Sequence, residues 1–333
     1  MLAALLVAGL VVFLTSMRLT RLADIIADRT RLGEALVGAT VLGAATSLSG
    51  MAVSFTAASS GDAALAFSNS VGGIAAQTLF LALADLIYRR ANLEHAAADT
   101  GNLFQCTLLL TLLSLPLIAY TGPPITVFGI HPVSFILIGG YVAGIRLAAQ
   151  VREAPMWRAV ETDETREDVP EEPEESDKSP VRALIAFVML MLILGAAGWV
   201  IANIASVMIT RFSLSSSVVG ALMTAVITSM PELVTTLAAV RRGALQLAIG
   251  GIIGGNTFDI LFLSLGDIGY REGSLYHAIG AGDLLWLSVG MLMSGILLIG
   301  LIMRQRAGPA TIGVESLLMM VTYGLAVAFA VTA

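Results

Sequence analysis

Two acidic residues lie inside long apolar stretches of the chain. Glu232 follows Pro231 in the stretch VITSMPELVTT, and Asp259 lies at the end of GGIIGGNTFD. A charged side chain at membrane depth costs on the order of 3 kcal/mol, so each is a candidate functional residue by default. Asn256 lies three residues before Asp259 and shares its helical face. Because hard cations prefer carboxylate, amide and carbonyl oxygens, these residue types indicate a cation site.

Pro231 predicts a break near the middle of the helix that carries Glu232. Proline removes a backbone hydrogen bond and clashes with the preceding turn, but it suits the first turn of a new helical segment. Thr228 or Ser229 is available to cap that segment. The break would free the carbonyl oxygens of residues 225–228, which are further candidate ligands for a cation.

The composition is that of a membrane protein. Of 333 residues, 57% are hydrophobic and 13% are charged, and the mean hydropathy is +0.88; a soluble domain has about 25% charged residues. Apolar stretches of roughly 20 residues recur, each long enough to cross a bilayer as a helix. The sequence predicts an all-α membrane protein with ten transmembrane helices, near residues 1–17, 34–58, 63–88, 102–120, 125–148, 183–209, 217–240, 244–268, 280–303 and 311–332.

One long polar segment divides these predicted helices into two groups of five. Residues 150–182 are rich in Glu and Pro, which is typical of a solvated, disordered tether. The predicted organisation is therefore a first five-helix repeat over residues 1–149, an acidic linker over 150–182, and a second five-helix repeat over 183–333.

The basic residues predict the orientation. Of the 18 Lys and Arg residues, only Arg211 and Arg271 fall on the side of the predicted membrane that lies away from the linker. Because cytoplasmic loops carry the excess of Lys and Arg, we expect a cytoplasmic linker and two outward-facing termini, in the plasma or inner membrane. The first apolar run has no charged segment before it, so it is interpreted as a membrane helix rather than a cleaved signal.

The two halves align without a gap when the sequence is shifted by 182 residues. Matching pairs include Thr46-Ser47 with Thr228-Ser229, Gly72-Gly73 with Gly254-Gly255, and Asp85 with Asp267. Because each half has five helices, the second half would enter the membrane from the opposite side. This predicts two inverted-topology repeats, with a substrate site at the midplane where broken helices of the two halves meet.

These stretches resemble a known family. TSMPELVTT and GGIIGGNTFD are similar to the two halves of an α-repeat in the sodium/calcium exchanger branch of the Ca2+/cation antiporters, whose pattern is approximately GTSLPEL followed by GN-x-x-GSNIFD. In that family the Glu of each Pro-Glu pair, an Asp or Asn of the next helix, and nearby Ser, Thr and carbonyl oxygens bind the transported ions. The resemblance, to a divergent prokaryotic-type member, implies this role for Glu232, Asp259, Thr228 and Ser229.

The first half departs from the family pattern. Gly50 stands where the family has Glu, Ser49 where it has Pro, and Gln77 at the position of the Asp or Asn. Gly50 still permits an unwound turn, so we expect a site from which one charge has been removed. The predicted ligand set is Glu232, Asp259, Asn256, Thr228, Ser229, Thr46, Ser47, Asn69 and Gln77.

Two carboxylates supply at most two negative charges. One divalent cation, or two monovalent cations or protons, would neutralise them, and uncompensated charge at midmembrane is costly. We therefore expect a secondary active antiporter that exchanges Ca2+ or another divalent cation for Na+ or H+ by alternating access. Two alternatives stay open: exchange of monovalent cations or protons only, and a non-transporting membrane protein that binds cations on the same scaffold.

Enzymatic chemistry is not expected. The sequence has no Ser/His/Asp set, HExxH or P-loop motif, and its three histidines, His95, His131 and His277, fall in predicted loops. Cys106 is the only cysteine, which excludes an intrachain disulfide or a thiolate metal site. No basic patch for nucleic acid occurs. The expected partners are the lipid bilayer and inorganic cations, without an obligatory protein partner or any cofactor beyond bound Ca2+, Na+ or H+.

Overall fold

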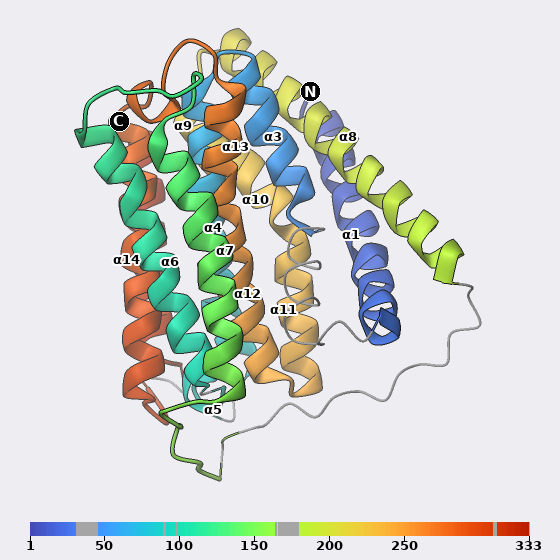
Figure 1. Cartoon of the computed structure of the whole chain (residues 1–333), viewed down its shortest axis with the longest axis vertical. Coiled ribbons are helices and arrows are strands. Elements are labelled where there is room, and N and C mark those ends of the chain that lie inside the picture. The colour runs from blue at the N-terminus through green and yellow to red at the C-terminus, as the bar shows by residue number, and fades with distance from the viewer. Residues whose placement is uncertain are drawn as a thin grey trace.

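The chain is a helical membrane protein (Figure 1). The computed structural model describes residues 1–30, 46–88, 91–97, 99–163, 165, 180–308 and 312–332. In this part of the chain eight helices are long and apolar enough to cross a membrane, and one bent helix pair makes a ninth. The described residues contain no strand beyond an isolated bridge between Val127 and Ile130. The prediction of an all-α membrane protein is therefore confirmed.

The first half consists of six described helices. They are α1 (Leu2–Thr30), α3 (Leu48–Ser59), α4 (Ala63–Ile87), α5 (Leu93–Ala96), α6 (Thr100–Thr121) and α7 (Pro132–Glu153).

The second half starts with one long helix and continues with shorter segments. They are α8 (Pro180–Phe212), α9 (Ser216–Val218), the π-helical turn η1 (Val219–Thr224), α10 (Ala225–Thr228), α11 (Met230–Arg242), α12 (Leu245–Asp259), α13 (Leu261–Gly269), the 3-10 turn η2 (Leu275–His277), α14 (Ala281–Met303) and α15 (Val314–Thr332).

Several predicted boundaries differ from the observed ones. The second predicted helix, 34–58, lies partly outside the described residues, and its described part is the 12-residue α3. α1 continues to Thr30 because residues 18–30 contain neither Gly nor Pro to end it. α7 begins at Pro132 rather than at residue 125, because Phe128 and Gly129 adopt positive φ angles that a helix cannot accommodate.

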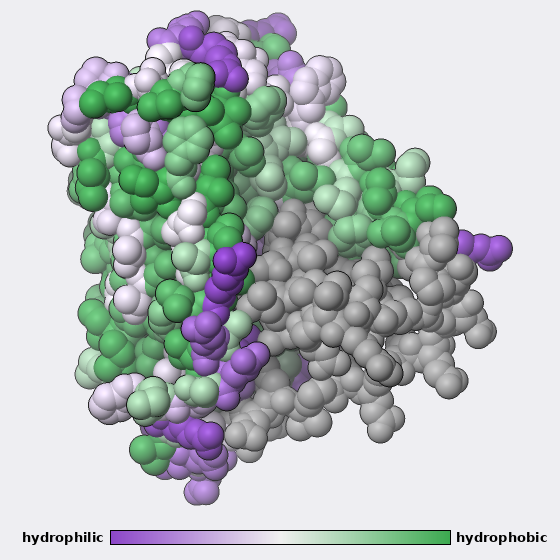
Figure 2. All heavy atoms as spheres, viewed as in Figure 1, coloured by the Kyte–Doolittle hydropathy of each residue, from purple (hydrophilic) through white to green (hydrophobic). Residues whose placement is uncertain are grey.

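The outer surface is apolar between two polar ends. In the coloured part of Figure 2, hydrophobic residues cover most of the visible face, and hydrophilic residues gather at its top and bottom and in one column beside the grey atoms. Many of the exposed large side chains belong to the long apolar helices, including Leu192 on α8 and Phe329 on α15. Such a surface fits a hydrocarbon environment, because lipid does not penalise exposed apolar side chains.

The helices form a main bundle and a flanking pair. α4 lies in the interior, with 78% of its span buried, and it packs against α3, α12, η1, α14 and α15. α1 and α8 lie side by side along one flank of the bundle (Figure 1). Their apolar contacts, together with Val53 of α3, form a core cluster separate from that of the main bundle.

Elements of the two halves begin at positions that differ by the same 182 residues as the sequence match. α3 and α11 begin at Leu48 and Met230, α4 and α12 at Ala63 and Leu245, α5 and η2 at Leu93 and Leu275, and α7 and α15 at Pro132 and Val314. The turns after α3 and α11 also match, because Gly61 and Gly243 both adopt left-handed φ angles, of 86° and 84°. The two halves therefore share local geometry as well as sequence.

Gly72 and Gly254 are matched positions with different surroundings, and they provide a test of the packing. A Cβ atom at Gly72 would lie 2.4 Å from the Cα of Ala221, whereas a Cβ at Gly254 would meet only Gln105 Oε1, at 3.9 Å. We expect Gly72→Ala to lower stability by on the order of 3 kcal/mol through overpacking against backbone, and Gly254→Ala to change it little. The thermal midpoint of the purified protein in detergent measures both effects, and equal midpoints for the two variants would contradict this packing.

Candidate cation-binding site

The helix that carries Glu232 is broken, as Pro231 predicts. The segments Ser216–Thr228 and Met230–Arg242 meet at an angle of 46°. Ser229 lies at the break with φ −93° and ψ 1°, and Pro231 lies in the first turn of the new segment. The predicted cap is wrong, because Ser229 makes no side-chain capping bond and the Thr228 hydroxyl donates back to the carbonyl oxygens of the preceding turn.

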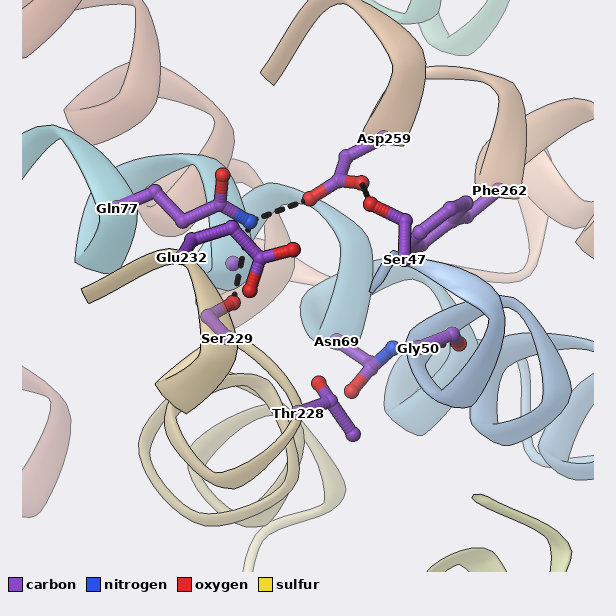
Figure 3. A pocket seen from close by; sticks show the side chains of 10 residues that line it. Ser47, Gly50, Asn69, Gln77, Thr228, Ser229, Glu232, Asp259 and Phe262 are labelled. Atoms are coloured by element: carbon purple, nitrogen blue, oxygen red, sulfur yellow. Dashed lines mark hydrogen bonds between the residues drawn. The ribbon is translucent and has the colours of Figure 1, made fainter. Parts of the chain in front are cut away.

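A cavity lies beside this break, between the two halves of the chain (Figure 3). Its lining residues are Ser47, Gly50, Asn69, Gly73, Gln77, Thr228, Ser229, Glu232, Asp259 and Phe262. The first five come from the first half and the other five from the second. The cavity has a volume of about 10 Å3, which is room for one water molecule or one bare cation.

Asp259 is the best-ordered acid of the cavity. The Ser47 hydroxyl donates to its Oδ1 at 2.7 Å, and the Gln77 amide donates to its Oδ2 at 2.6 Å. The same amide nitrogen lies 3.1 Å from the Ser229 hydroxyl. Hydrogen bonds to a buried carboxylate stabilise its charged form, so both donors from the first half hold the acid of the second half in a fixed position.

Glu232 faces the same cavity, and one of its carboxylate oxygens has no hydrogen-bond partner. Its side chain is buried, Thr46 is a hydrogen-bond partner of the carboxylate, and Oε2 has no partner. The Gln77 Oε1 atom is buried and also without a partner. None of the lining residues is basic. Because buried oxygens without donors are costly, a water molecule, a proton or a cation in the cavity would stabilise these atoms.

Seven of the nine predicted ligands line the cavity, and two do not. Asn256 is buried but directs its amide to Thr78 Oγ1 at 3.0 Å, outside the lining. Thr46 contacts the site through Glu232 rather than from the lining. Within the lining, Asn69 is already engaged, because its amide donates to the Gly50 carbonyl and its Oδ1 accepts from Thr224.

Three lining residues were not predicted as ligands: Gly50, Gly73 and Phe262. A Cβ atom at Gly50 would lie 2.7 Å from the Phe262 ring. The ring therefore fills the space that a longer side chain at position 50 would need. The glycine was visible in the sequence as a departure from the family pattern, but the ring that accompanies it was not.

Among the described residues that line the cavity, Glu232 and Asp259 are the ones that carry charge. In the described part of the chain, no group of three or more His, Cys, Asp or Glu residues has a metal-binding arrangement. A cation here would therefore be held by two carboxylates and by neutral oxygens of hydroxyl and amide groups. Such an oxygen-rich set suits Na+ or Ca2+ better than a metal that prefers nitrogen or sulfur.

The sequence matches a known family over most of its length. The profile of the sodium/calcium exchanger protein family matches residues 1–147 and 182–332. Inner membrane protein YrbG of Escherichia coli (strain K12) is 36% identical over 73 residues, which cover 22% of this chain and 22% of that protein. The aligned part therefore spans about a fifth of this curated relative.

Two solved structures share the fold over nearly the whole chain. The H+/Ca2+ exchanger CAX superposes with a TM-score of 0.66 at 13% identity, covering 99% of this chain and 86% of the other. The sodium-calcium exchanger NCX_Mj, soaked with Na+ and Sr2+, superposes with a TM-score of 0.61 at 18% identity, covering 98% and 97%.

The contact between Gly50 and Phe262 can be tested by a double-mutant cycle. We expect Gly50→Ala to lower stability by about 1–3 kcal/mol, because the new methyl group overlaps the ring. Phe262→Ala removes the ring, so the double variant should lose less stability than the two single losses added together. Gly73→Ala is the control, since its Cβ would meet Ser229 Oγ at an ordinary 3.6 Å. Strict additivity of thermal stability in the cycle would contradict the contact.

Proposed function

The chain belongs to the sodium/calcium exchanger family, and from this membership we propose that it is a secondary active antiporter that exchanges Ca2+ or another divalent cation for Na+ or H+. The observation that carries the proposal is the cavity at the broken helix. There Glu232 and Asp259 lie buried, the Oε2 atom of Glu232 has no partner, and residues of both halves enclose a space the size of one ion. The role of these residues as ion ligands is part of the proposal.

The charge of the cavity limits the exchange. Glu232 and Asp259 supply at most two negative charges, and Gln77 supplies none where the second half has Asp259. One divalent cation, two Na+ or two protons would leave the cavity neutral. Three Na+ would leave an uncompensated positive charge in a medium of low dielectric, which is costly. The proposed exchange is therefore less electrogenic than one that relies on a fuller set of acids.

We infer that the halves are inverted-topology repeats that give alternating access to the cavity. The common shift of 182 residues in helix starts supports this inference. So does the hydrogen bond between Gln77 and Asp259, whose positions differ by the same 182 residues. The separate core cluster of α1 and α8 provides a flanking unit that can move against the main bundle as a body.

Isotope uptake into proteoliposomes tests the proposed site. We expect Glu232→Gln and Asp259→Asn each to reduce Ca2+ uptake by on the order of 100-fold, since losing one charge of a buried ion pair costs about 3 kcal/mol or more. Glu153→Gln, at the exposed end of α7, is the matched control and should leave uptake unchanged. Unaltered uptake in both cavity variants would exclude this site.

The same vesicles separate the alternatives. Uptake driven by an outward Na+ gradient identifies Na+ as the counter-ion, and uptake driven by a pH gradient identifies H+. Flux of monovalent cations without divalent uptake would favour the monovalent exchanger. Saturable Ca2+ binding without flux under either gradient would favour the non-transporting alternative. The reason to test this alternative is that the first half lacks the acids of the family pattern.

The proposed orientation places the linker in the cytoplasm and both termini outside. Met156 in the linker and Phe128 beyond the other end of α7 are each 93% exposed, and Cys106 is buried. In a Cys106→Ser background, we expect an impermeant thiol reagent to label Met156→Cys in inverted membrane vesicles and Phe128→Cys in intact cells. The reverse labelling pattern would invert the proposed topology.

A further inference from the structure

Asp267 fastens three segments together at one end of the bundle. Its Oδ1 accepts the backbone N–H of Leu275 at 2.9 Å, and its Oδ2 accepts the N–H of His131 and the hydroxyl of Ser134, both at 2.7 Å. The Tyr276 hydroxyl also lies 2.9 Å from the Ser134 hydroxyl. We call this set of contacts the Asp267 knot. It contains one carboxylate, and each oxygen of that carboxylate accepts a hydrogen bond. His131, expected in a solvated loop, is buried here.

Asp85 of the first half makes an equivalent set of contacts, the Asp85 knot, which also includes residues of the second half. Its Oδ1 accepts the N–H of Leu93 and its Oδ2 accepts the N–H of Gly313, both at 2.8 Å. The positions are those of the Asp267 knot shifted by 182 residues. However, Glu94 stands here where the other knot has Tyr276, and Glu315 stands where it has Val133.

The Asp85 knot therefore gathers three acids at one place. A Cβ atom at Gly313 would lie 3.3 Å from Asp85 Oδ2 and 3.3 Å from Glu315 Oε1, so these two oxygens approach the same point. The charges that act on Glu94 are those of Asp85 and Glu315. Because the Asp267 knot closes with a single acid, the fold itself does not require the two additional carboxylates.

The additional acids are buried without donors. Glu94 is 0% exposed, and neither of its carboxylate oxygens meets a donor from another residue. Glu315 Oε1 and Asn92 Oδ1, both buried, are also without partners. Each of these atoms is an acceptor, and a buried acceptor without a donor costs about 1–3 kcal/mol, more if it is charged. A proton or a positive charge would therefore stabilise the buried acceptor atoms of the Asp85 knot.

Among the described basic residues near the Asp85 contacts, Arg304 and His95 have other partners, although the buried Nε atom of Arg304 has none. Arg304 directs its guanidinium to the carbonyl oxygens of Val160 and His95 and to the Thr165 hydroxyl. His95 is bonded through Nδ1 to the Arg304 carbonyl and through Nε2 to Thr162. These contacts hold residues 160–165 of the linker next to the Asp85 knot.

Two more observations narrow the choice of ligand. In the described residues, no acidic triad is spaced to coordinate a metal ion. Burial and the neighbouring charges of Asp85 and Glu315 raise the pKa of Glu94 well above its ordinary value. A protonated Glu94 becomes a hydroxyl donor for a neighbouring carboxylate, so one proton satisfies two of the unpaired groups.

We propose that Asp85, Glu94 and Glu315 form a second proton-binding site, apart from the central cavity, with the proton carried on Glu94. While the proton is bound, the knot holds α4, α5 and α15 together beneath the docked start of the linker. Loss of the proton places two or three negative charges side by side in a buried space and loosens this end of the bundle. The site thus reports pH on the side of the membrane that bears the linker.

The thermal midpoint of the full-length protein as a function of pH tests this site. Because folding raises the pKa of Glu94, its stabilising contribution is complete at low pH and disappears as pH rises through the folded-state pKa. We expect the midpoint to fall with pH in that window, and Glu94→Gln to remove a dependence worth about one proton per chain. The reference protein and the Glu94→Gln variant both also carry Glu232→Gln and Asp259→Asn. Protons bound in the central cavity therefore do not contribute to the pH dependence, and the result does not depend on whether the proposed transport function is correct.

Two further variants keep the test decisive. If Glu94→Gln fails to fold, the pair Glu94→Tyr and Glu315→Val installs the residues of the Asp267 knot and should also flatten the pH dependence. Tyr276→Phe is the control and should leave it intact. Infrared spectroscopy should show a protonated carboxylic acid at neutral pH that Glu94→Gln removes. An identical pH dependence in both proteins would overturn the proposal. So would a rise of the midpoint on adding Ca2+ or Mg2+ at constant pH that Glu94→Gln abolishes, because that result would make the site a metal site.

Discussion

The rest of the structure depends on the cost of placing two carboxylates inside a membrane-spanning bundle. Glu232 and Asp259 are buried in one small cavity, where each negative charge lowers the stability of the other. Three features offset this cost. The broken helix brings backbone dipoles and hydroxyl groups to the site, the first half supplies donors from Ser47 and Gln77, and a space remains for a cation. The fold and the proposed function therefore follow from the same electrostatic constraint.

Matched positions of the two halves carry unequal numbers of acids at the two places where the halves can be compared. At the central cavity the second half carries the acids and the first half is neutral, with Gln77 opposite Asp259. At the knots the additional acids come from both halves, because Glu94 lies in the first half and Glu315 in the second, and the matching residues Tyr276 and Val133 are neutral. Shared backbone geometry with unequal charge indicates that the frame is maintained by packing and backbone hydrogen bonds, while the charges can be changed without altering it.

Local signals in the sequence predicted most of the polar residues that line the cavity, but they did not predict contacts between residues distant in sequence. Pro231 fixes the break because its effect is confined to its own turn. The repeat placed Gln77 opposite Asp259. The Phe262 ring against Gly50 could not be predicted, since side-chain direction depends on the packing of α13 against α3. Likewise Glu315 was indistinguishable from an ordinary acid in the first turn of a helix, because Asp85 lies 230 positions away.

Equivalent residues of the two halves contact each other directly at the cavity. Gln77 bonds to Asp259, and the contact of Ser47 with Asp259 has its counterpart in the contact of Ser229 with Gln77. If the halves are inverted repeats, as proposed, equivalent residues can touch only near the axis that relates them. In the proposed transport cycle, the cavity opens alternately to the two sides of the membrane as the two halves exchange their conformations. Groups on the axis move least in this exchange. The proposed ligand set at this point would hold a cation at nearly constant distances in both states of that cycle. For the same reason, replacing an acid by Gln77 removes charge without moving the site.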